Sequence, residues 1–302
     1  MTADRREQAT LVALLRTRPE GMTWPDIMAD VVATGNASDL WARTRPATLL
    51  EVPGEGDPIE QATSDIATWV AADLMFTTVL DPSYPARLRG IHEAPPVLFA
   101  RGELRQHDVA VSVVGSRKAS ERGLDMAAAI AREVVKLDVT VASGLAEGID
   151  AAAHRSALDS GGRTVAVIGT GINKYYPAVN RSLQDEIASR GAVLSQFWPD
   201  APPQKHTFLM RNATMSGYGI ATIVVEAGET SGARAQARMA VGHGRPVILT
   251  DLVVANNQWA RELVRRPGVS VAGSLREVVA MVGELRDKPT DVEEVVRRLI
   301  SA

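Results

Sequence analysis

From about residue 108 onward, short runs of apolar, β-branched residues alternate with longer segments of helical pattern. The runs are apolar at nearly every position, which is typical of strands that other elements cover on both faces. A helix-length segment follows each run, so the strands are joined by right-handed helical crossovers. The pattern therefore predicts an α/β fold with a doubly wound, mostly parallel sheet. The predicted strands are 109–115, 139–143, 164–169, 192–197, 220–227, 246–250 and 269–272.

The N-terminal quarter of the chain has a different pattern of apolar and polar residues. Residues 1–75 show no alternation of strands and helices, and we expect them to form a small helical domain. Helices are predicted over 8–16 and 59–74, because apolar residues recur there at helical spacing. The segment 51–58 between them, EVPGEGDP, is a proline- and glycine-containing loop.

The remaining boundaries follow from composition. Residues 76–107 are dense in proline and are expected to form an extended connector that packs onto the sheet. We assign the connector to the sheet domain, which then covers 76–285. Residues 286–302 are expected to form a short C-terminal helix, with no winged-helix domain. The helices predicted within the sheet domain are 123–137, 149–159, 179–190, 209–216, 232–242, 256–265 and 274–283.

Bulk composition excludes several classes of protein. None of the 302 residues is cysteine, so there is no disulfide framework and no thiolate chemistry, which fits a cytoplasmic location. No apolar run approaches the roughly 20 residues that cross a bilayer, and the charged N-terminus lacks the pattern of a signal peptide. We therefore expect no membrane association. Because the net charge is -3, affinity for a polyanion would have to come from a local patch.

The loops that leave the strands hold the candidate site, because ligands of an open parallel sheet bind beyond the carboxyl ends of its strands. These loops combine glycine turns with helix N-termini, whose free N–H groups and positive dipole suit phosphate. Cationic side chains stand among them. The candidate phosphate-binding residues from these loops, and from the helix before the strand at 220–227, are Gly115, Ser116, Arg117, Lys118, Ser143, Gly144, Gly148, Gly169, Gly171, Lys174, Arg211, Asn212, Ser231 and Gly232.

Three kinds of phosphate are compatible with these loops: a dinucleotide cofactor, a mononucleotide that is cleaved, and a nucleic-acid backbone. The chain contains no G-x-x-x-x-G-K-[ST], which argues against a P-loop ATPase. The strand at 109–115 is followed by GSRKAS and not by G-x-G-x-x-G, so it does not offer the arrangement of glycines and a later acidic ribose ligand that a dehydrogenase needs. We therefore expect no dinucleotide, no other cofactor and no metal.

For several single residues, the sequence is compatible with both a structural and a functional role. Glu226 ends a buried strand, where an unpaired carboxylate costs folding free energy. Both an ion pair with an arginine and a role in binding are compatible with this position. His154 lies among alanines on a helix and is expected to be an ordinary packed or surface residue. Phe197 and Trp198 follow a strand, where they would either stack on a base or belong to the core.

Five motifs occur in one order and resemble a known family. They are GSRKAS at 115–120, ASGLAEGIDAAAHRSAL at 142–158, GGRTVAVIGTGINKYYP at 161–177, MRN at 210–212 and VVEAGETSGARAQARMAVGHGRPV at 224–247. Together with the preceding proline-rich segment, they resemble the DNA-processing protein A (DprA/Smf) family over about residues 78–250. The resemblance implies a Rossmann-like fold, a homodimer and a positive pocket for single-stranded DNA. In that family the pocket serves protection of incoming DNA and loading of the RecA recombinase during natural transformation, with no catalytic step.

The resemblance also assigns the family's site residues. The arginine of GSR corresponds to Arg117, and the RN pair corresponds to Arg211 and Asn212. The basic residue after the GTG loop corresponds to Lys174 or Arg181. The residues of the SGLA-GID loop correspond to Ser143, Gly144, Leu145, Gly148 and Asp150. A carboxylate beside a phosphate would repel it, so we expect Asp150 to cap its own helix or to orient an arginine.

The sequence departs from the family pattern in three places. Ala213 stands where the family commonly has a second arginine, Arg234 lies at a helix start where it could compensate in part, and residues 251–268 replace a proline–glycine turn. We therefore interpret the chain as a divergent member. The alternative function is that of a nucleotide-binding protein or a nucleoside-monophosphate phosphoribohydrolase-like enzyme, in which Glu226 and Arg117 would be catalytic. Such enzymes share a related fold and use a PGGxGTxxE turn, which is absent here.

Overall fold

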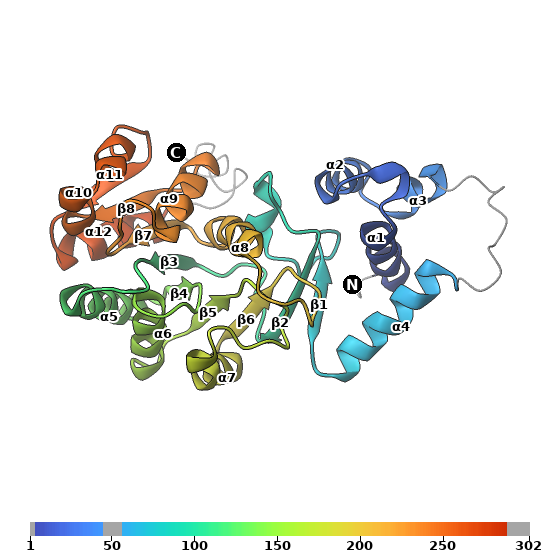
Figure 1. The fold of residues 1–302 in the computed structure, drawn as a ribbon, viewed down its shortest axis with the longest axis horizontal. Coiled ribbons are helices and arrows are strands. Elements are labelled where there is room, and N and C mark those ends of the chain that lie inside the picture. The colour runs from blue at the N-terminus through green and yellow to red at the C-terminus, as the bar shows by residue number, and fades with distance from the viewer. Residues whose placement is uncertain (1–3, 45–55, 289–302) are drawn as a thin grey trace, which may run out of the picture.

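A single sheet runs through most of the molecule (Figure 1). The computed structural model describes residues 4–44 and 56–288. The strands in these residues are β1 (Met75–Thr78), β2 (Val97–Gly102), β3 (Ala110–Val114), β4 (Thr140–Ser143), β5 (Thr164–Val167), β6 (Ala192–Ser195), β7 (Ala221–Val224), β8 (Val247–Thr250) and β9 (Val269–Ala272). In space they follow the order β1-β2-β6-β5-β4-β3-β7-β8-β9.

The strands from β3 to β9 all pair in parallel with one another, which confirms the predicted Rossmann-like, doubly wound α/β fold. The chain first builds outward from β3 through β4 and β5 to β6, and then returns to place β7 on the other side of β3. The strand order therefore reverses between β3 and β7. In open parallel sheets a crevice forms at such a reversal, and ligands bind there.

The connector at 76–107 contributes two strands that the sequence analysis did not predict. β2 pairs antiparallel with β6, and β1 pairs antiparallel with β2 at the edge. The prolines directly before β2, Pro95 and Pro96, obscure its apolar run in the sequence, but in the structure they precede the strand and leave its hydrogen bonds intact. The connector is thus an extension of the sheet and not only a segment packed against it.

Helices cover both faces of the sheet. In Figure 1, α5, α6 and α7 lie on one side, and α8 and α9 lie on the other. The helices of this part are α5 (Glu121–Lys136), α6 (Ile149–Asp159), α7 (Arg181–Arg190), α8 (Lys205–Tyr218), α9 (Gly232–Gly242), α10 (Asp251–Asn256), α11 (Gln258–Leu263) and α12 (Leu275–Arg286), with the 3-10 turns η2 (Ala86–Gly90) and η3 (Ala178–Asn180). Two differences from the prediction stand out. α8 starts four residues before the predicted position 209, and the helix predicted at 256–265 is the shorter α11, preceded by α10, which was not predicted.

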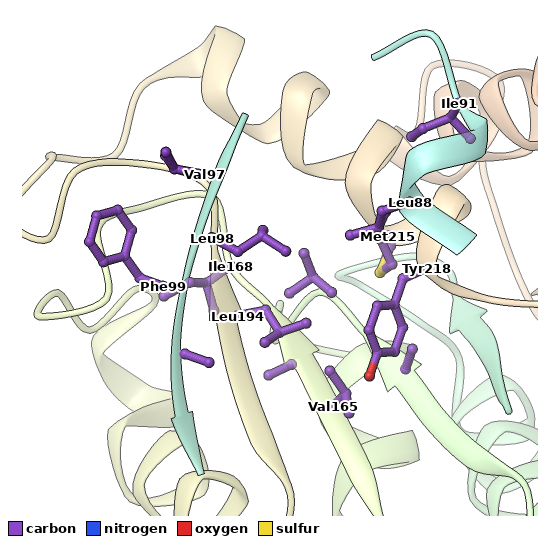
Figure 2. Close-up of a cluster of buried hydrophobic side chains, with 14 of the residues drawn as sticks. Leu88, Ile91, Val97, Leu98, Phe99, Val165, Ile168, Leu194, Met215 and Tyr218 are labelled. Atoms are coloured by element: carbon purple, nitrogen blue, oxygen red, sulfur yellow. The ribbon is translucent and has the colours of Figure 1, made fainter. Parts of the chain in front are cut away.

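A buried apolar cluster fixes the position of α8 (Figure 2). Met215 and Tyr218 of α8 pack with Leu88 and Ile91 from the η2 segment, above the apolar side chains of β2, β5 and β6. A Cβ on Gly217 would lie 2.5 Å from Cδ1 of Ile91, so the helix approaches this segment more closely than any side chain would allow. The helix that carries Arg211 and Asn212 is therefore held rigidly over the sheet.

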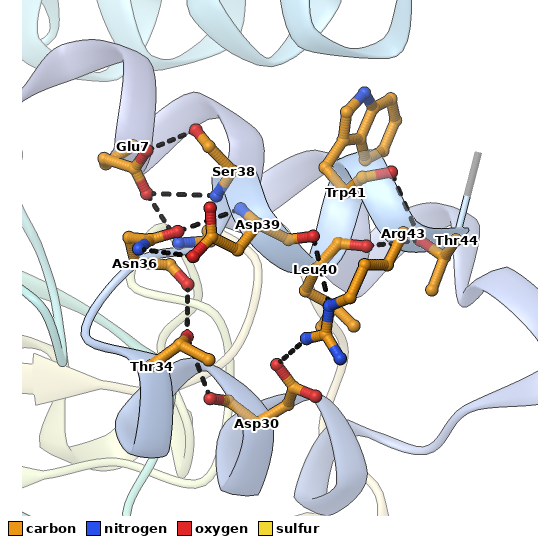
Figure 3. A network of polar contacts seen from close by, with 11 residues as sticks. Glu7, Asp30, Thr34, Asn36, Ser38, Asp39, Leu40, Trp41, Arg43 and Thr44 are labelled. Carbon is orange, nitrogen blue, oxygen red and sulfur yellow. Dashed lines mark hydrogen bonds and ion pairs between the residues drawn. The ribbon is translucent and has the colours of Figure 1, made fainter. Parts of the chain in front are cut away.

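Residues 4–44 and 56–71 form the expected helical region beside the β1 edge. Its elements are α1 (Arg5–Thr17), η1 (Pro19–Gly21), α2 (Trp24–Thr34), α3 (Ser38–Thr44) and α4 (Pro58–Ala71). Glu7 of α1 accepts hydrogen bonds from the backbone N–H of Ala37, at 2.6 Å, and from Ser38, while Arg43 pairs with Asp30 (Figure 3). These contacts tie the start of α3 to α1 and its end to α2.

An aromatic cluster joins the helical region to the sheet. The ring centroids of Trp24 and Trp198 lie 5.7 Å apart, and those of Trp69 and Phe99 lie 4.9 Å apart. The guanidinium of Arg16 lies 5.1 Å from the ring centroid of Trp198. Trp198 therefore has a packing role, and its neighbour Phe197 is buried. Of the two alternatives for these rings, the packing contacts favour a place in the core.

Two earlier expectations fall outside the described residues: most of the loop at 51–58, and the C-terminal helix beyond residue 288. Within the described residues, no helix is both long and apolar enough to cross a membrane.

Candidate functional site

A cavity of about 460 Å³ opens at the reversal of strand order, between the loop after β3, the start of α9 and one face of α8. Its wall contains most of the cations that the sequence analysis selected at this edge. The lining residues are Val114, Gly115, Ser116, Arg117, Lys118, Ala146, Asp150, Lys205, Phe208, Leu209, Arg211, Asn212, Met215, Ser231, Gly232, Ala233 and Gln236.

The loop after β3 is held by its backbone. The N–H of Ser116 donates to the carbonyl of Glu226 at 2.7 Å, and the N–H of Lys118 donates to Oγ of Ser116 at 3.1 Å. A Cβ on Gly115 would lie 2.5 Å from Cγ1 of Ile149, so only glycine fits there. The side chains of Arg117 and Lys118 are exposed at the mouth of this tightly packed loop. The loop thus presents two cations from a fixed backbone.

The loop after β4 supports the loop after β3. Its residues Ser143, Gly144 and Gly148 do not line the 460 Å³ cavity. Gly148 has a φ of 78°, and a Cβ there would lie 2.3 Å from the carbonyl oxygen of Ser116. The N–H of Ile149 donates to that same oxygen at 3.2 Å. Ser143 is buried, and its hydroxyl donates to the carbonyl of Val113 at 2.6 Å. Gly148 therefore lets the loop after β4 pack against the loop after β3, and Ser143 links β4 to β3.

Arg211 is the buried cation of the site. Its Nη1 donates to the carbonyl of Val167 at 2.8 Å, and its Nε has no hydrogen-bond partner among the described residues. The carboxylate of Asp150 accepts from the N–H groups of Gly144, at 3.1 Å, and Ala146, at 3.3 Å. Burial lowers the pKa of Arg211, and the nearby charge of Asp150 opposes this shift. Burial raises the pKa of Asp150, and Arg211 opposes that.

Asp150 thus stabilises the loop before its own helix and balances the charge of Arg211. Its side chain does not cap α6 in the usual way, because the N-cap residue is Gly148 and makes no side-chain hydrogen bond. Of the two expected roles, the electrostatic one toward an arginine fits the structure better. The carboxylate is buried, so it does not present its charge to solvent at the mouth of the cavity.

An aromatic pair lies beside the cations. The guanidinium of Arg117 lies 5.6 Å from the ring centroid of Phe208, and the ring of Phe208 lies 5.4 Å from that of Tyr176. Tyr176 is 40% exposed. A second, smaller hollow of about 40 Å³ lies at this pair, lined also by Gly144 and Arg211. Rings that are open to solvent next to arginines are suited to stacking with nucleobases.

The sequence analysis missed Lys205 and Phe208. Both lie on α8, at positions 205 and 208, and together with Arg211 and Met215 they repeat every three or four residues. This spacing places them on one face of a helix. The signal was present in KHTFLMRN, but the predicted helix started at 209 and left both residues in a loop.

The start of α9 contributes Ser231 and Gly232 to the cavity, as predicted. The hydroxyl of Ser231 accepts from the N–H of Arg234 at 3.3 Å and caps the helix. Arg234 itself donates from Nη1 to the carbonyl of Glu229 at 2.8 Å and does not line the cavity. Ala213 is buried and does not line it either, so the departures at these two positions leave the cavity wall unchanged.

The glycines and the lysine of the third loop (169–177), and Arg181 after it, lie away from both hollows, although Tyr176 and Pro177 line the smaller one. Lys174 pairs with Asp200 at 3.5 Å, and the guanidinium of Arg181 lies 4.5 Å from the ring centroid of Tyr175. Cβ atoms on Gly169 and Gly171 would collide with Phe208 and with the backbone of Trp198, respectively, so both glycines serve packing. The candidate residues that line neither hollow are Ser143, Gly148, Gly169, Gly171, Lys174 and Arg181.

Glu226 and His154 have structural partners. The carboxylate of Glu226 accepts from the N–H of Ser120 at 3.0 Å and from its hydroxyl, at the start of α5. Glu226 lines neither hollow. An ion pair with an arginine, one of the two alternatives for Glu226, is not found within residues 4–44 and 56–288. Instead, the carboxylate accepts hydrogen bonds at the N-terminus of α5. His154 is buried, and its Nδ1 lies 2.6 Å from Oγ1 of Thr164.

Comparison with known proteins identifies the family. Residues 75–282 match the family of the DNA recombination-mediator protein A. The chain belongs to this family. It is 40% identical over 171 residues to the DNA processing protein DprA of Streptococcus pneumoniae, covering 56% of this chain and 60% of that protein. It is also 40% identical over 212 residues to the putative DNA processing protein DprA of Mycobacterium tuberculosis, covering 68% of this chain and 54% of that protein. The chain thus spans little more than half the length of these relatives.

Solved structures agree with the family assignment. The crystal structure of DprA from Streptococcus pneumoniae superposes with a TM-score of 0.68 at 29% identity, over 93% of this chain and 98% of that one. A structure of DprA from Helicobacter pylori, described for its single-stranded DNA binding mode, superposes with a TM-score of 0.62 at 22% identity, over 70% of this chain and 96% of that one. The second match supports the fold of this DprA-family protein.

Proposed function

We propose that this protein is a DprA-type, non-catalytic binder of single-stranded DNA, and that its cavity at the strand reversal holds the phosphate backbone. The observation that carries the proposal is the charge at the cavity mouth. Arg117, Lys118 and Lys205 form no ion pair with any carboxylate in the described part of the chain, although the whole chain is net negative. Free cations gathered in a hollow attract a polyanion.

The surroundings of these cations favour a single strand over a duplex. Phe208 and Tyr176 lie beside Arg117, and their rings are accessible for stacking with unpaired bases. Base stacking on aromatic side chains tolerates every base, so little sequence preference is expected. The description of the Helicobacter pylori relative as a single-stranded DNA binder supports the same ligand.

A titration of labelled oligo-dT at two salt concentrations tests the proposal. Saturable binding is expected, with an affinity that falls steeply with salt, by a slope of about -0.7 per phosphate neutralised. Arg117→Ala is expected to weaken binding and to reduce that slope. Arg132→Ala is the matched control, because Arg132 is equally exposed but lies on α5 and lines neither hollow. An absence of saturable binding, or equal behaviour of the two variants, would exclude the proposal.

The geometry gives no support to the hydrolytic alternative. A phosphoribohydrolase-like reaction needs a carboxylate that faces the bound nucleotide, whereas Glu226 is bonded to Ser120 at the start of α5. Asp150 is the carboxylate that lines the cavity, and it is buried and bonded to backbone N–H groups. Arg117 therefore remains as a binding residue, without a catalytic partner among the residues that line the cavity.

Family membership supports three further parts of the proposal: a homodimer, a RecA-type recombinase as the partner that receives the bound strand, and a cytoplasmic location. Sedimentation of the purified protein tests the dimer. Capture of the recombinase by the protein with and without bound oligo-dT tests the partner. Recombinase that is captured equally by a column without the protein would exclude that part of the proposal.

A further inference from the structure

Apart from the 460 Å³ DNA cavity and the 40 Å³ hollow beside Tyr176, another hollow, termed the second hollow, lies on the other flank of α8, between this helix and the N-terminal helical region. It has a volume of about 430 Å³. Its wall includes Arg18, Trp24 and Pro25 from the N-terminal region, and His206 and Met210 from α8. In Figure 1, α8 lies between α9 on one side and α1 and α2 on the other, which places this hollow and the DNA cavity on opposite flanks of one helix.

The two hollows flank the first turns of α8. Lys205, Phe208 and Leu209 line the DNA cavity, while His206 and Met210 line the second hollow. Leu209 and Met210 are 49% and 40% exposed, so the ridge that separates the hollows is apolar and open to solvent. A strand that leaves the DNA cavity at Lys205 can cross this ridge without meeting a carboxylate from the helix.

The chemistry of the second hollow suits a nucleotide. Its wall contains an arginine, a histidine and two tryptophans, and no carboxylate. Arg18 is exposed and forms no ion pair within the part of the chain that the structure describes. Two acidic side chains of this region are already engaged: Asp65 with Arg16 at 2.5 Å, and Asp26 with the N–H of Thr23 at 2.8 Å. An anion at Arg18 would therefore not compete with a resident counter-ion.

We propose that a single strand bound in the DNA cavity continues over the N-terminal turns of α8 into this second hollow. There the side chain of Arg18 contacts a backbone phosphate, and a base lies against the apolar wall formed by Trp24, Pro25 and Met210. The N-terminal helical region is then part of the nucleic-acid interface. This inference rests on the proposed function, because it extends the path of the same ligand.

Oligonucleotide length separates the two sites. A helix with its side chains is about 10–12 Å across, and stacked nucleotides advance about 3.4 Å each, so about three or four nucleotides are needed to cross α8. An oligo-dT of about four nucleotides fills the DNA cavity alone, whereas one of about 12 reaches both hollows. The experiment measures the affinity of both oligonucleotides for the full chain and for three variants.

The variants are Arg18→Glu, Met210→Glu and, as a matched control, Arg5→Glu. Arg5 is exposed at the opposite end of α1 and lines neither hollow. Both Arg18→Glu and Met210→Glu are expected to weaken binding of the longer oligonucleotide at least fivefold and to leave the shorter one within twofold. Because Met210 is an exposed residue in mid-helix, that variant keeps the test valid if Arg18→Glu disturbs the end of α1.

The outcomes distinguish the inference from the function on which it rests. Failure of the unaltered protein to bind either oligonucleotide would exclude the proposed function. Binding of the shorter oligonucleotide, together with unchanged binding of the longer one by both variants, would overturn the second subsite alone. That result would leave the hollow to another occupant, such as a peptide. A loss that Arg5→Glu reproduces would show a general charge effect and would also overturn it.

Discussion

The guanidinium of Arg211 lies directly on the backbone of Gly144: a Cβ at position 144 would stand 1.7 Å from Nη1 of the arginine. The buried cation of the site therefore depends on a residue without a side chain, contributed by a different strand end. The same glycine donates its N–H to Asp150 at 3.1 Å, so one loop holds both members of the buried charge pair.

Gly144→Ala should displace Arg211 from this position. We expect the variant to bind oligo-dT at least tenfold more weakly, because the cation leaves its place between the 460 Å³ cavity and the 40 Å³ hollow beside Tyr176. Overpacking of a buried site also costs about 1–3 kcal/mol of folding free energy, which chemical denaturation can measure. Gly232→Ala is a useful control, since a Cβ at that cavity-lining position meets nothing within 4 Å. Equal affinity of the two variants would contradict the role assigned to Gly144.

Lys205 and Phe208 should affect binding in different ways. Lys205→Ala removes a charge, so it should lower the affinity and reduce the salt slope by about 0.7. Phe208→Ala removes a ring, so it should cost about 1–3 kcal/mol of binding free energy and leave the slope unchanged. Fluorescence anisotropy over a series of salt concentrations measures both quantities. If the two variants change the slope alike, Phe208 does not act by stacking.

The sheet and the place of the site could be predicted from the sequence, because apolar runs and glycine turns are local signals. Gly115, Arg117 and Lys118 follow one strand directly, so their position at the carboxyl edge needs only the order of elements. The antiparallel strand β2 could not be predicted in this way. Its partner β6 stands about 90 residues later, and prolines precede it.

The exact set of residues in the cavity also depends on contacts that no local pattern shows. Lys174 and Arg181 are cations at the right edge, yet one pairs with Asp200 and the other covers Tyr175. These contacts, made by residues of the third loop and next to η3, hold both side chains away from the cavity. Conversely, Phe208 enters the site only because Gly169 leaves room for its ring, with a Cβ there 2.6 Å from Cδ1.

Glu226→Gln should separate a structural from a catalytic role. The carboxylate accepts hydrogen bonds from Ser120 at the start of α5, and loss of such a capping interaction costs about 0.5–2 kcal/mol. We expect lower thermal stability and an affinity for oligo-dT within twofold of the unaltered protein. Release of free base from nucleoside monophosphates that disappears in this variant would instead restore the hydrolytic interpretation.

His154 should make the fold sensitive to acid. Burial lowers the pKa of His154 to about 3, and the charge of Arg211 acts in the same direction, whereas an unfolded histidine has a pKa of about 6.5. The unfolded chain therefore binds a proton that the folded protein excludes, and stability from this residue is fully present above pH of about 6.5 and is lost as the pH falls toward 3.

The size of this effect follows from the same linkage. Each pH unit below about 6.5 should cost about 1.4 kcal/mol, so the change from pH 7.5 to pH 5 costs about 2 kcal/mol. His154→Gln keeps a donor for Oγ1 of Thr164 but cannot take up the proton. Urea denaturation at both pH values should therefore show a smaller loss of stability in the variant than in the unaltered protein, although the variant is less stable at neutral pH. Equal losses in the two proteins would show that His154 is protonated in the folded state or that another buried group dominates acid unfolding.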